Sequence, residues 1–130
     1  MSVAQPRNPG PLLEAVGISR RFGGLSALDE VSVTVRSGQV FGLIGPNGAG
    51  KTTIFNLLTG VYEPTAGNIH FEGRRINGLR PYQISRLGVS RTFQNIRLFP
   101  GMSVLENVMT ACHIHARQNL PARKRQPPDD

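Results

Sequence analysis

The chain has little of several features that would assign it to particular protein classes. Its 130 residues include one cysteine, Cys112, so the sequence predicts neither a disulfide framework nor a cysteine-based zinc site. No apolar run approaches the roughly 20 residues of a membrane-spanning helix. The first residues also lack the apolar stretch of a secretory signal. We therefore expect one domain of ordinary size in a reducing, cytoplasmic setting.

Acidic side chains are scarce as well, with 8 Asp and Glu against 15 Lys and Arg and a net charge of +7. Part of the excess lies in residues 113–130, where basic residues are mixed with prolines. Such a tail is typical of an arm that binds nucleic acid or an anionic membrane, or of a disordered, solvated segment. No aromatic residue that would stack on bases is interleaved in it, so we expect the second case and no nucleic-acid partner.

The most informative stretch that is present covers residues 45–52, which read GPNGAGKT. They match G-x-x-x-x-G-K-[ST], the phosphate-binding P-loop. The loop must wrap phosphates with inward-pointing backbone N–H groups, and glycine lets the backbone approach and turn sharply enough. Lys51 would reach the β- and γ-phosphates, and the Thr52 hydroxyl would ligate Mg²⁺. A plain glycine-rich turn has no need of this lysine and threonine at that offset.

The segments around the loop have the order that the motif requires. Residues 39–44 form a short, mostly apolar run that predicts a buried strand. Ile54, Leu57 and Leu58 follow at helical spacing, and Gly60 stands where a helix C-cap glycine belongs. The start of this helix would add partial positive charge at the phosphates.

Other elements are predicted from apolar alternation, caps and turn residues. Strands are expected at residues 12–22, 31–35, 68–72 and 89–93. Pro81 predicts the first turn of a short helix that runs to about Leu87. Ser103 and Glu106 form a capping box for a helix that runs to about Ala116.

Three smaller features have two interpretations on the residues alone. Gln94 follows a predicted strand, where ligands bind in α/β folds, so it either orients water or a metal or is an ordinary polar loop residue. Phe22 is either a stacking platform for a purine or the last apolar residue of a strand, and spacing alone favours the latter. Asp29 and Glu30 look like a fragment of an NTPase acidic pair. Since no apolar strand precedes them, we interpret them as acids of a turn.

Together the motifs resemble those of ATP-binding-cassette (ABC) ATPases. Residues 45–60, GPNGAGKTTIFNLLTG, are similar to the P-loop and helix of that family, and residues 91–99, RTFQNIRLF, to its Q-loop. Residues 102–108, MSVLENV, resemble the segment that follows. The RFGG run at 21–24, with Phe-Asn at 55–56, resembles in particular the ATP-binding subunit of branched-chain amino acid importers.

The resemblance implies a fold and a set of nucleotide contacts. The fold would be α/β, an incomplete P-loop NTPase (ABC ATPase) core with an N-terminal antiparallel β subdomain. It would occupy residues 12–112, between a flexible leader at 1–11 and the basic tail at 113–130. Phe22 would stack on adenine, and Gln94 would contact Mg²⁺ or the attacking water. The phosphates and Mg²⁺ would be held by Gly45, Pro46, Asn47, Gly48, Ala49, Gly50, Lys51, Thr52 and Thr53.

By the same resemblance the chain would be the ATP-binding component of an ABC importer, most simply one for branched-chain amino acids, with ATP and Mg²⁺ as cofactors. It would lie on the inner face of the cell membrane with membrane subunits and a second ATP-binding subunit. The family's signature motif, Walker B acidic pair and switch histidine would follow the Q-loop segment, and we recognise none of them in residues 1–130. We therefore expect ATP binding without efficient hydrolysis. A non-catalytic nucleotide-binding fragment and an ABC ATPase for another substrate are the alternatives.

Overall fold

The computed structural model describes residues 10–116 and the side chains of residues 10–113. Within this range the chain forms two compact units, and the division falls between Arg91 and Thr92. Most of the leader predicted at 1–11 and most of the tail predicted at 113–130 lie outside the described residues. No helix in the described part is long and apolar enough to cross a membrane.

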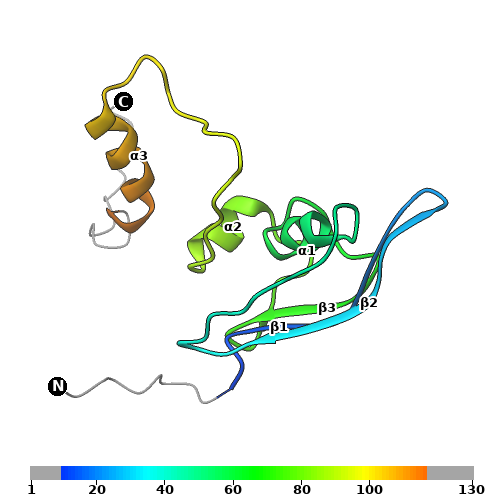
Figure 1. Cartoon of the computed structure of the whole chain (residues 1–130). Helices are drawn as coiled ribbons and strands as arrows, with labels where there is room; N and C mark the ends of the chain where they lie inside the picture. The colour runs from blue at the N-terminus through cyan, green and yellow to red at the C-terminus, as the bar shows by residue number, and fades with distance from the viewer. Residues whose placement is uncertain (1–9, 117–130) are drawn as a thin grey trace, which may run out of the picture. The chain divides into compact units, whose positions relative to one another are not determined.

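An antiparallel sheet forms one layer of the first unit (Figure 1). Its strands, in the spatial order β2-β1-β3-β4, are β1 (Leu13–Phe22), β2 (Leu25–Val35), β3 (Ala66–Phe71) and β4 (Arg74–Arg75). Strand β1 pairs antiparallel with β2 on one side and with β3 on the other. The expected antiparallel β subdomain is confirmed, and the strands predicted at 12–22, 31–35 and 68–72 all belong to it.

Two helices, α1 (Lys51–Leu58) and α2 (Pro81–Arg86), lie on the same face of this sheet (Figure 1). Side chains alternate between the two faces of a regular strand, and a register shift in β1 between Ala15 and Ile18 brings both of these residues into the core. Ala15 and Ile69, which are paired across these strands, are both buried. The core consists of Ala15, Ile18, Leu28, Ile54, Leu57, Ile69, Ile76 and Ile84.

The ends of both helices follow the predicted local signals. Helix α1 stops before Gly60, whose φ of 78° is left-handed and whose N–H donates to the Leu57 carbonyl at 3.3 Å. Helix α2 begins with Pro81, and the N–H of Arg80 donates to Oε1 of Gln83 at 2.9 Å. These contacts satisfy backbone groups that a helix leaves without partners at its ends.

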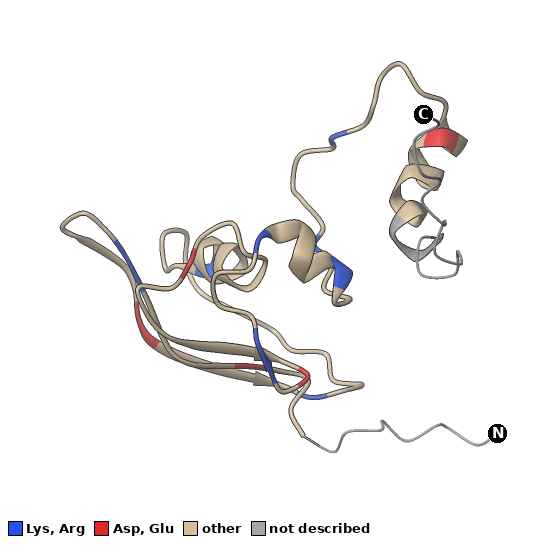
Figure 2. Ribbon diagram, turned by 180° about the vertical axis from the view of Figure 1, so that it is seen from behind, with Lys and Arg blue, Asp and Glu red and all other residues tan. Residues whose placement is uncertain are grey.

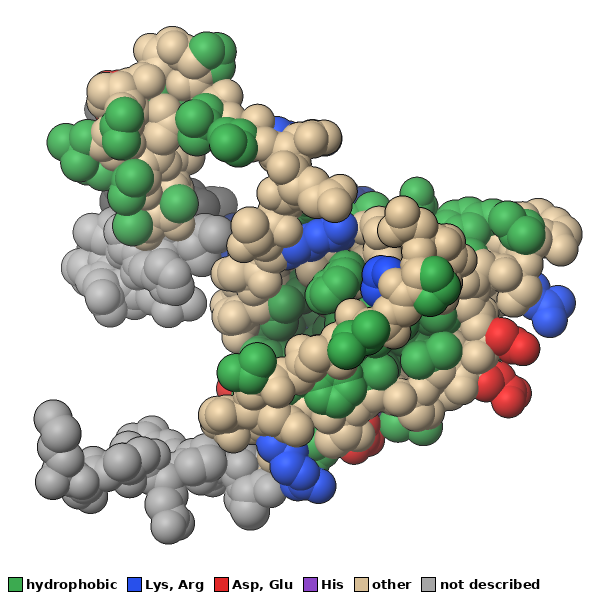
Figure 3. Space-filling view, viewed as in Figure 1, with side chains coloured by type: hydrophobic (Ala, Val, Ile, Leu, Met, Phe, Trp, Pro, Cys, Tyr) green, Lys and Arg blue, Asp and Glu red, His purple; other side chains and the backbone are tan. Residues whose placement is uncertain are grey.

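The strand predicted at residues 39–44 is wrong. This segment is irregular, and two of its apolar side chains are almost fully exposed, Val40 at 98% and Ile44 at 97%. Figure 3 shows hydrophobic side chains gathered on the visible face of the first unit. A strand of a parallel sheet needs neighbours that bond its backbone and cover both of its faces. Among the described residues no strand pairs with this segment, so its apolar character alone does not produce a strand.

The strand predicted at residues 89–93 is also wrong, since this segment is irregular and pairs with no strand among the described residues. In its middle, Arg91 instead contacts helix α1 through its side chain. Alternation of apolar residues indicates a strand only where a partner strand is available.

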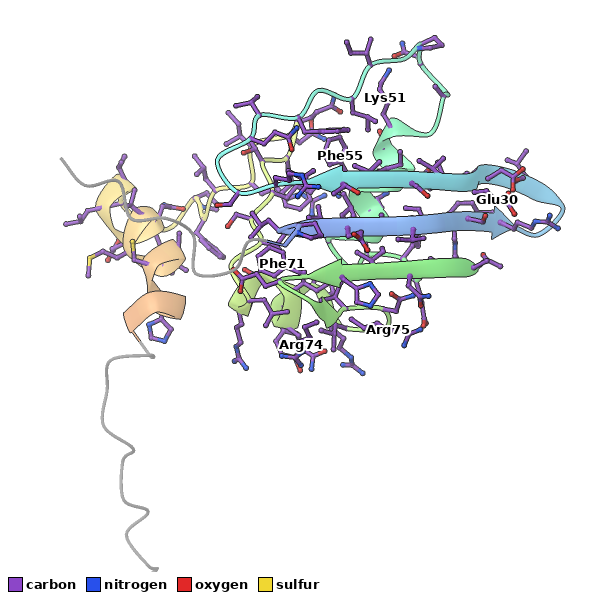
Figure 4. The ribbon with its side chains drawn as sticks, turned by 90° about the horizontal axis from the view of Figure 1, so that it is seen from below. Glu30, Lys51, Phe55, Phe71, Arg74 and Arg75 are labelled. Carbon is purple, nitrogen blue, oxygen red and sulfur yellow. The ribbon has the colours of Figure 1, made fainter. Side chains whose placement is uncertain are left out.

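Asp29 and Glu30 do not form the predicted turn but lie within β2 at a bulge. Arg20 pairs with Leu28 and Ile18 with Val31, so the two acids stand opposite the single residue Ser19. Glu30 has a φ of 44°, and its N–H donates to Oγ of Ser19 at 2.9 Å. This pairing places the acids in the sheet, near the hairpin end that Figure 4 marks at Glu30.

The second unit contains helix α3 (Val104–Ala116), which the structure describes up to the residue where the sequence predicts its end. The capping box is confirmed, because the Ser103 N–H donates to Oε2 of Glu106 at 2.7 Å and the Glu106 N–H to Oγ of Ser103 at 3.2 Å. The side chain of Asn107 accepts from the Phe99 N–H at 2.9 Å and donates to the Ser103 carbonyl at 2.8 Å. These bonds attach the loop of residues 99–103 to the first turns of α3.

Candidate phosphate-binding site

The candidate site begins at the start of α1. The helix follows directly from the loop, with Gly50 as its N-cap residue, and no side chain caps it. No acidic residue lies in its first turn. The first N–H groups of a helix have no partner within the helix, and the helix dipole adds partial positive charge there. The first turn therefore offers donors to an anion.

The backbone of the loop has a shape that glycine permits. Gly48 and Gly50 have φ values of 85° and 97°, in the left-handed region. The Ala49 N–H donates to the Pro46 carbonyl at 3.2 Å and closes a tight turn. A Cβ on Gly45 would lie 3.2 Å from Cβ of Ala49, which is closer than side chains normally approach. The motif's glycines therefore stand where the fold requires them.

Lys51 bends back over this loop. Its Nζ donates to the Gly45 carbonyl and, at 3.0 Å, to the Pro46 carbonyl. In Figure 4, Lys51 lies at the start of α1 and away from Arg74 and Arg75 of β4. Phosphate oxygens would compete strongly with these neutral carbonyls for the ammonium group, because they add the attraction between opposite charges to the hydrogen bond.

The donor set fits a magnesium-bound polyphosphate. It combines the ammonium of Lys51, the N–H groups at the start of α1 and the exposed Thr52 hydroxyl, with the half-buried Thr53 beside it. Within residues 10–113, no cluster of three or more His, Cys, Asp or Glu side chains could hold a metal by itself. Mg²⁺ keeps several waters and binds through few protein groups plus the phosphates.

The loop is seated against the sheet near its hairpin end. A Cβ on Gly50 would stand 3.0 Å from the Ala27 carbonyl oxygen and 3.3 Å from Cδ1 of Leu28. Leu28 pairs with Arg20 of β1, and Phe22 follows two residues later as the last residue of that strand. The P-loop and Phe22 therefore belong to the same region of the first unit.

Phe22 is 38% exposed and contacts two residues that the sequence analysis did not single out. Its ring centroid lies 5.1 Å from that of Tyr62, at an interplanar angle of 78°. Cζ of Arg20 lies 4.7 Å from the centroid of Phe22. Arg20 stands two positions before Phe22 on the same strand, and the two-residue period of a strand could have predicted that their side chains share a face. No local pattern in the sequence links Tyr62 to Phe22.

Gln94 belongs to a different unit from the P-loop residues and Phe22. It is exposed and lies in the second unit, while the P-loop residues and Phe22 lie in the first. Its contact with Mg²⁺ or water stays a prediction. The chain that leads to it is anchored, because Nη1 of Arg91 donates to Oδ1 of Asn56 in α1 at 2.6 Å.

Charge is distributed broadly over the first unit. Figure 2 shows Lys and Arg on strands, helices and loops rather than in one stripe. Next to the loop, positive charge comes from Lys51 and from the start of α1.

The sequence of this chain is similar to those of known proteins. A protein-family model described as ABC transporter matches residues 28–128. The chain is 52% identical over 112 residues to the high-affinity branched-chain amino acid transport ATP-binding protein BraF of Pseudomonas aeruginosa. It is 48% identical over 110 residues to the protein of the same description, LivG, of Escherichia coli. These alignments cover 86% and 85% of this chain but 44% and 43% of the relatives, so the chain spans less than half of their length.

Solved structures resemble the fold. The crystal structure of an ATP-binding cassette of an ABC transporter in its ADP conformation has a TM-score of 0.65 and 29% identity, and the match covers 93% of this chain and 49% of that one. The structure of an ATP-binding subunit of an ABC transporter has a TM-score of 0.72 and 28% identity, with 80% and 42% covered. The predicted class, part of an ABC ATPase domain, is confirmed.

Proposed function

The chain belongs to the ABC transporter family, and on that premise we propose that it binds ATP with Mg²⁺ as part of the ATP-binding component of an importer. One observation carries the proposal. The loop of residues 45–52 is folded at the uncapped start of α1, with the ammonium of Lys51 lying across it. A loop of this kind is suited to the phosphates of a nucleotide.

The proposed roles follow from the donor set. Backbone N–H groups of residues 47–52 bind the β- and γ-phosphates, and Lys51 exchanges its carbonyl partners for phosphate oxygens. The Thr52 hydroxyl binds Mg²⁺, and Thr53 approaches the α-phosphate. The ring of Phe22 stacks on adenine, which its partial exposure permits. When bound, ATP supplies the phosphoryl group that ABC ATPases transfer to water.

We propose slow hydrolysis for this 130-residue polypeptide. Phosphoryl transfer depends on positioning the water and stabilising charge on the transferred group. The sequence supplies Gln94 for this role, in the second unit, but no recognisable Walker B acidic pair. Residues 1–130 on their own are therefore expected to hold ATP and to turn it over little.

The relatives' names support the substrate class. BraF and LivG are described as branched-chain amino acid transport proteins, and the chain is 48–52% identical to them. We propose that this chain serves a transporter of the same substrate class. It would bind membrane subunits at the inner face of the membrane, together with a second ATP-binding subunit, with Gln94 close to the contact.

Titration calorimetry with ATP and Mg²⁺ tests the binding site. Lys51→Ala should weaken binding by about 10- to 100-fold, because charge-assisted hydrogen bonds to phosphate are lost. The matched control is Arg74→Ala, which removes one positive charge from an exposed position on β4 and should change the affinity by less than about twofold. Equal binding by the wild type and Lys51→Ala would reject the proposed site.

Two further measurements separate the remaining alternatives. Phosphate release by the purified polypeptide should be close to background, and robust release that Lys51→Ala abolishes would contradict slow hydrolysis. Association with the membrane subunits of a branched-chain amino acid importer supports the importer role. ATP binding without such association favours a nucleotide-binding fragment or a transporter for another substrate.

A further inference from the structure

The side chains behind Phe22 form a packed group of three. The guanidinium carbon of Arg20 lies 4.7 Å from the ring centroid of Phe22 and 5.2 Å from that of Tyr62. The two rings meet at 78° with their centroids 5.1 Å apart. A cation within about 6 Å of a ring centroid is attracted by the ring's quadrupole, and perpendicular ring pairs are favourable as well. All three contacts therefore stabilise one arrangement of the Phe22 ring.

Arg20 is held in place from its far end. Its Nη1 donates to the Glu63 carbonyl at 2.8 Å, and its Nε is buried with no hydrogen-bond partner among the described residues. The guanidinium is thus partly removed from water, a setting in which a cation–π contact is stronger than at an exposed site.

The loop that supplies Tyr62 and Glu63 is bonded to β1 at Thr65. The Thr65 N–H donates to the Ser19 carbonyl at 2.8 Å, and the Arg21 N–H donates to Oγ1 of Thr65 at 3.1 Å. These two bonds hold the end of the loop against the strand that carries Phe22.

The same loop is a continuation of α1. The N–H groups of Val61 and Tyr62 both donate to the Asn56 carbonyl, at 2.9 and 3.3 Å. Helix α1 therefore carries the phosphate-binding residue Lys51 at its start and the support for Phe22 just beyond its end. The connection sets the position of the Phe22 ring relative to the P-loop.

We propose that Arg20 and Tyr62 are positioning residues for base recognition. Arg20 covers one face of the Phe22 ring, Tyr62 holds the ring's angle, and the exposed part of the ring is presented to the purine. The proposal rests on the ATP site proposed above. It assigns the recognition of the base to the Arg20–Phe22–Tyr62 group and the binding of the phosphates to residues 45–52.

The test compares ATP with tripolyphosphate, which keeps the phosphates but has no base. Calorimetry is performed with Mg²⁺ on the whole chain and on the variants Phe22→Ala, Arg20→Ala, Arg20→Lys and Tyr62→Leu. Arg20→Ala should lower the affinity for ATP by about five- to tenfold, the size of one cation–π contact, and that for tripolyphosphate by less than about twofold. Arg20→Lys should recover part of the ATP affinity, because lysine retains the charge. Tyr62→Leu should act in the same direction as Arg20→Ala.

The control variant is Arg21→Ala. Arg21 is the exposed neighbour of Arg20 on the same strand, and its contact with Thr65 uses the backbone N–H, which alanine retains. It should leave both affinities unchanged. A purely structural role of Arg20 would weaken both ligands alike and would overturn the proposal, as would an unchanged affinity for ATP.

The outcomes also separate this inference from the proposed function. If the wild type binds neither ATP nor tripolyphosphate, the ATP site itself is wrong. If Phe22→Ala weakens ATP selectively but Arg20→Ala and Tyr62→Leu do not, the ATP site stands and the positioning role is wrong. If Phe22→Ala changes neither affinity, the base is recognised elsewhere and the inference fails.

Discussion

The side chain of Arg91, the first residue of the segment 91–99 that resembles a Q-loop, is bonded to helix α1 through a 2.6 Å hydrogen bond from Nη1 to Oδ1 of Asn56. The same Nη1 lies 3.4 Å from Oγ1 of Thr59. Asn56 also accepts two backbone N–H groups at the end of α1 through its carbonyl. The P-loop helix is thus bonded at its last turn to a residue three positions before Gln94.

Removing this bond should lower stability. Asn56→Ala and Arg91→Ala are each expected to reduce the free energy of unfolding by about 1–3 kcal/mol, since the bond has a charged donor and is partly buried. Urea denaturation of both single variants and the double variant gives the coupling energy, which should be about 0.5–3 kcal/mol. Additive losses would mean that the two side chains stabilise the fold independently.

Gly60 and Gly73 form a matched pair, because both have a φ of 78°. A Cβ on Gly60 would stand 2.7 Å from the Leu79 carbonyl oxygen and 2.8 Å from Cδ1 of Ile84, whereas a Cβ on Gly73 would meet nothing within 4 Å. Gly73→Ala should cost about 1–2 kcal/mol from the left-handed backbone alone. Gly60→Ala should cost about 1–3 kcal/mol more because of the added crowding. Similar denaturation midpoints for the two variants would argue against the crowding at Gly60.

The capping box of α3 should depend on pH. The hydrogen bond from the Ser103 backbone and then that from its side chain lower the pKa of the Glu106 carboxyl below its ordinary value of 4.5. The ionised carboxylate therefore stabilises the cap fully above pH 4.5, and this contribution is lost as the pH falls through the lowered pKa. An NMR titration of the Glu106 carboxyl carbon should give a midpoint below 4.5, and the hydrogen-exchange protection factors of the first-turn amides of α3, corrected for the intrinsic pH dependence, should fall below it. Glu106→Gln should remove the pH dependence, and a midpoint at or above 4.5 would contradict the cap.

The exposed apolar segment at residues 39–44 should affect self-association more than folding. Since Val40 and Ile44 are almost fully exposed, Val40→Ser and Ile44→Ser should change the free energy of unfolding by less than about 0.5 kcal/mol. The double variant should reduce concentration-dependent light scattering, because exposed apolar surface promotes association. Ile69→Ser, at a buried position of β3, is the contrasting variant and should unfold the first unit. A large loss of stability in the double variant would show that the segment is packed in solution.

Local patterns in the sequence predicted several features correctly, because each depends on residues a few positions apart. The helix that follows the P-loop, its end at Gly60, the start of α2 at Pro81 and the capping box at Ser103 are all of this kind. Asp29 and Glu30 were placed wrongly, since a bulge is decided by the register with β1 and not by the acids themselves.

The sequence by itself therefore determined the P-loop motif at residues 45–52, the helices and their caps, and the family resemblance that the comparisons confirmed. Only the tertiary structure decided which apolar runs became strands. Residues 39–44 and 89–93 have strand-like composition, but a strand exists only where another backbone completes its hydrogen bonds. The tertiary structure also decided what surrounds Phe22. Arg20 and Glu63 are 43 positions apart, and their contact arises from the pairing of β1 with the loop after α1, which no local pattern encodes.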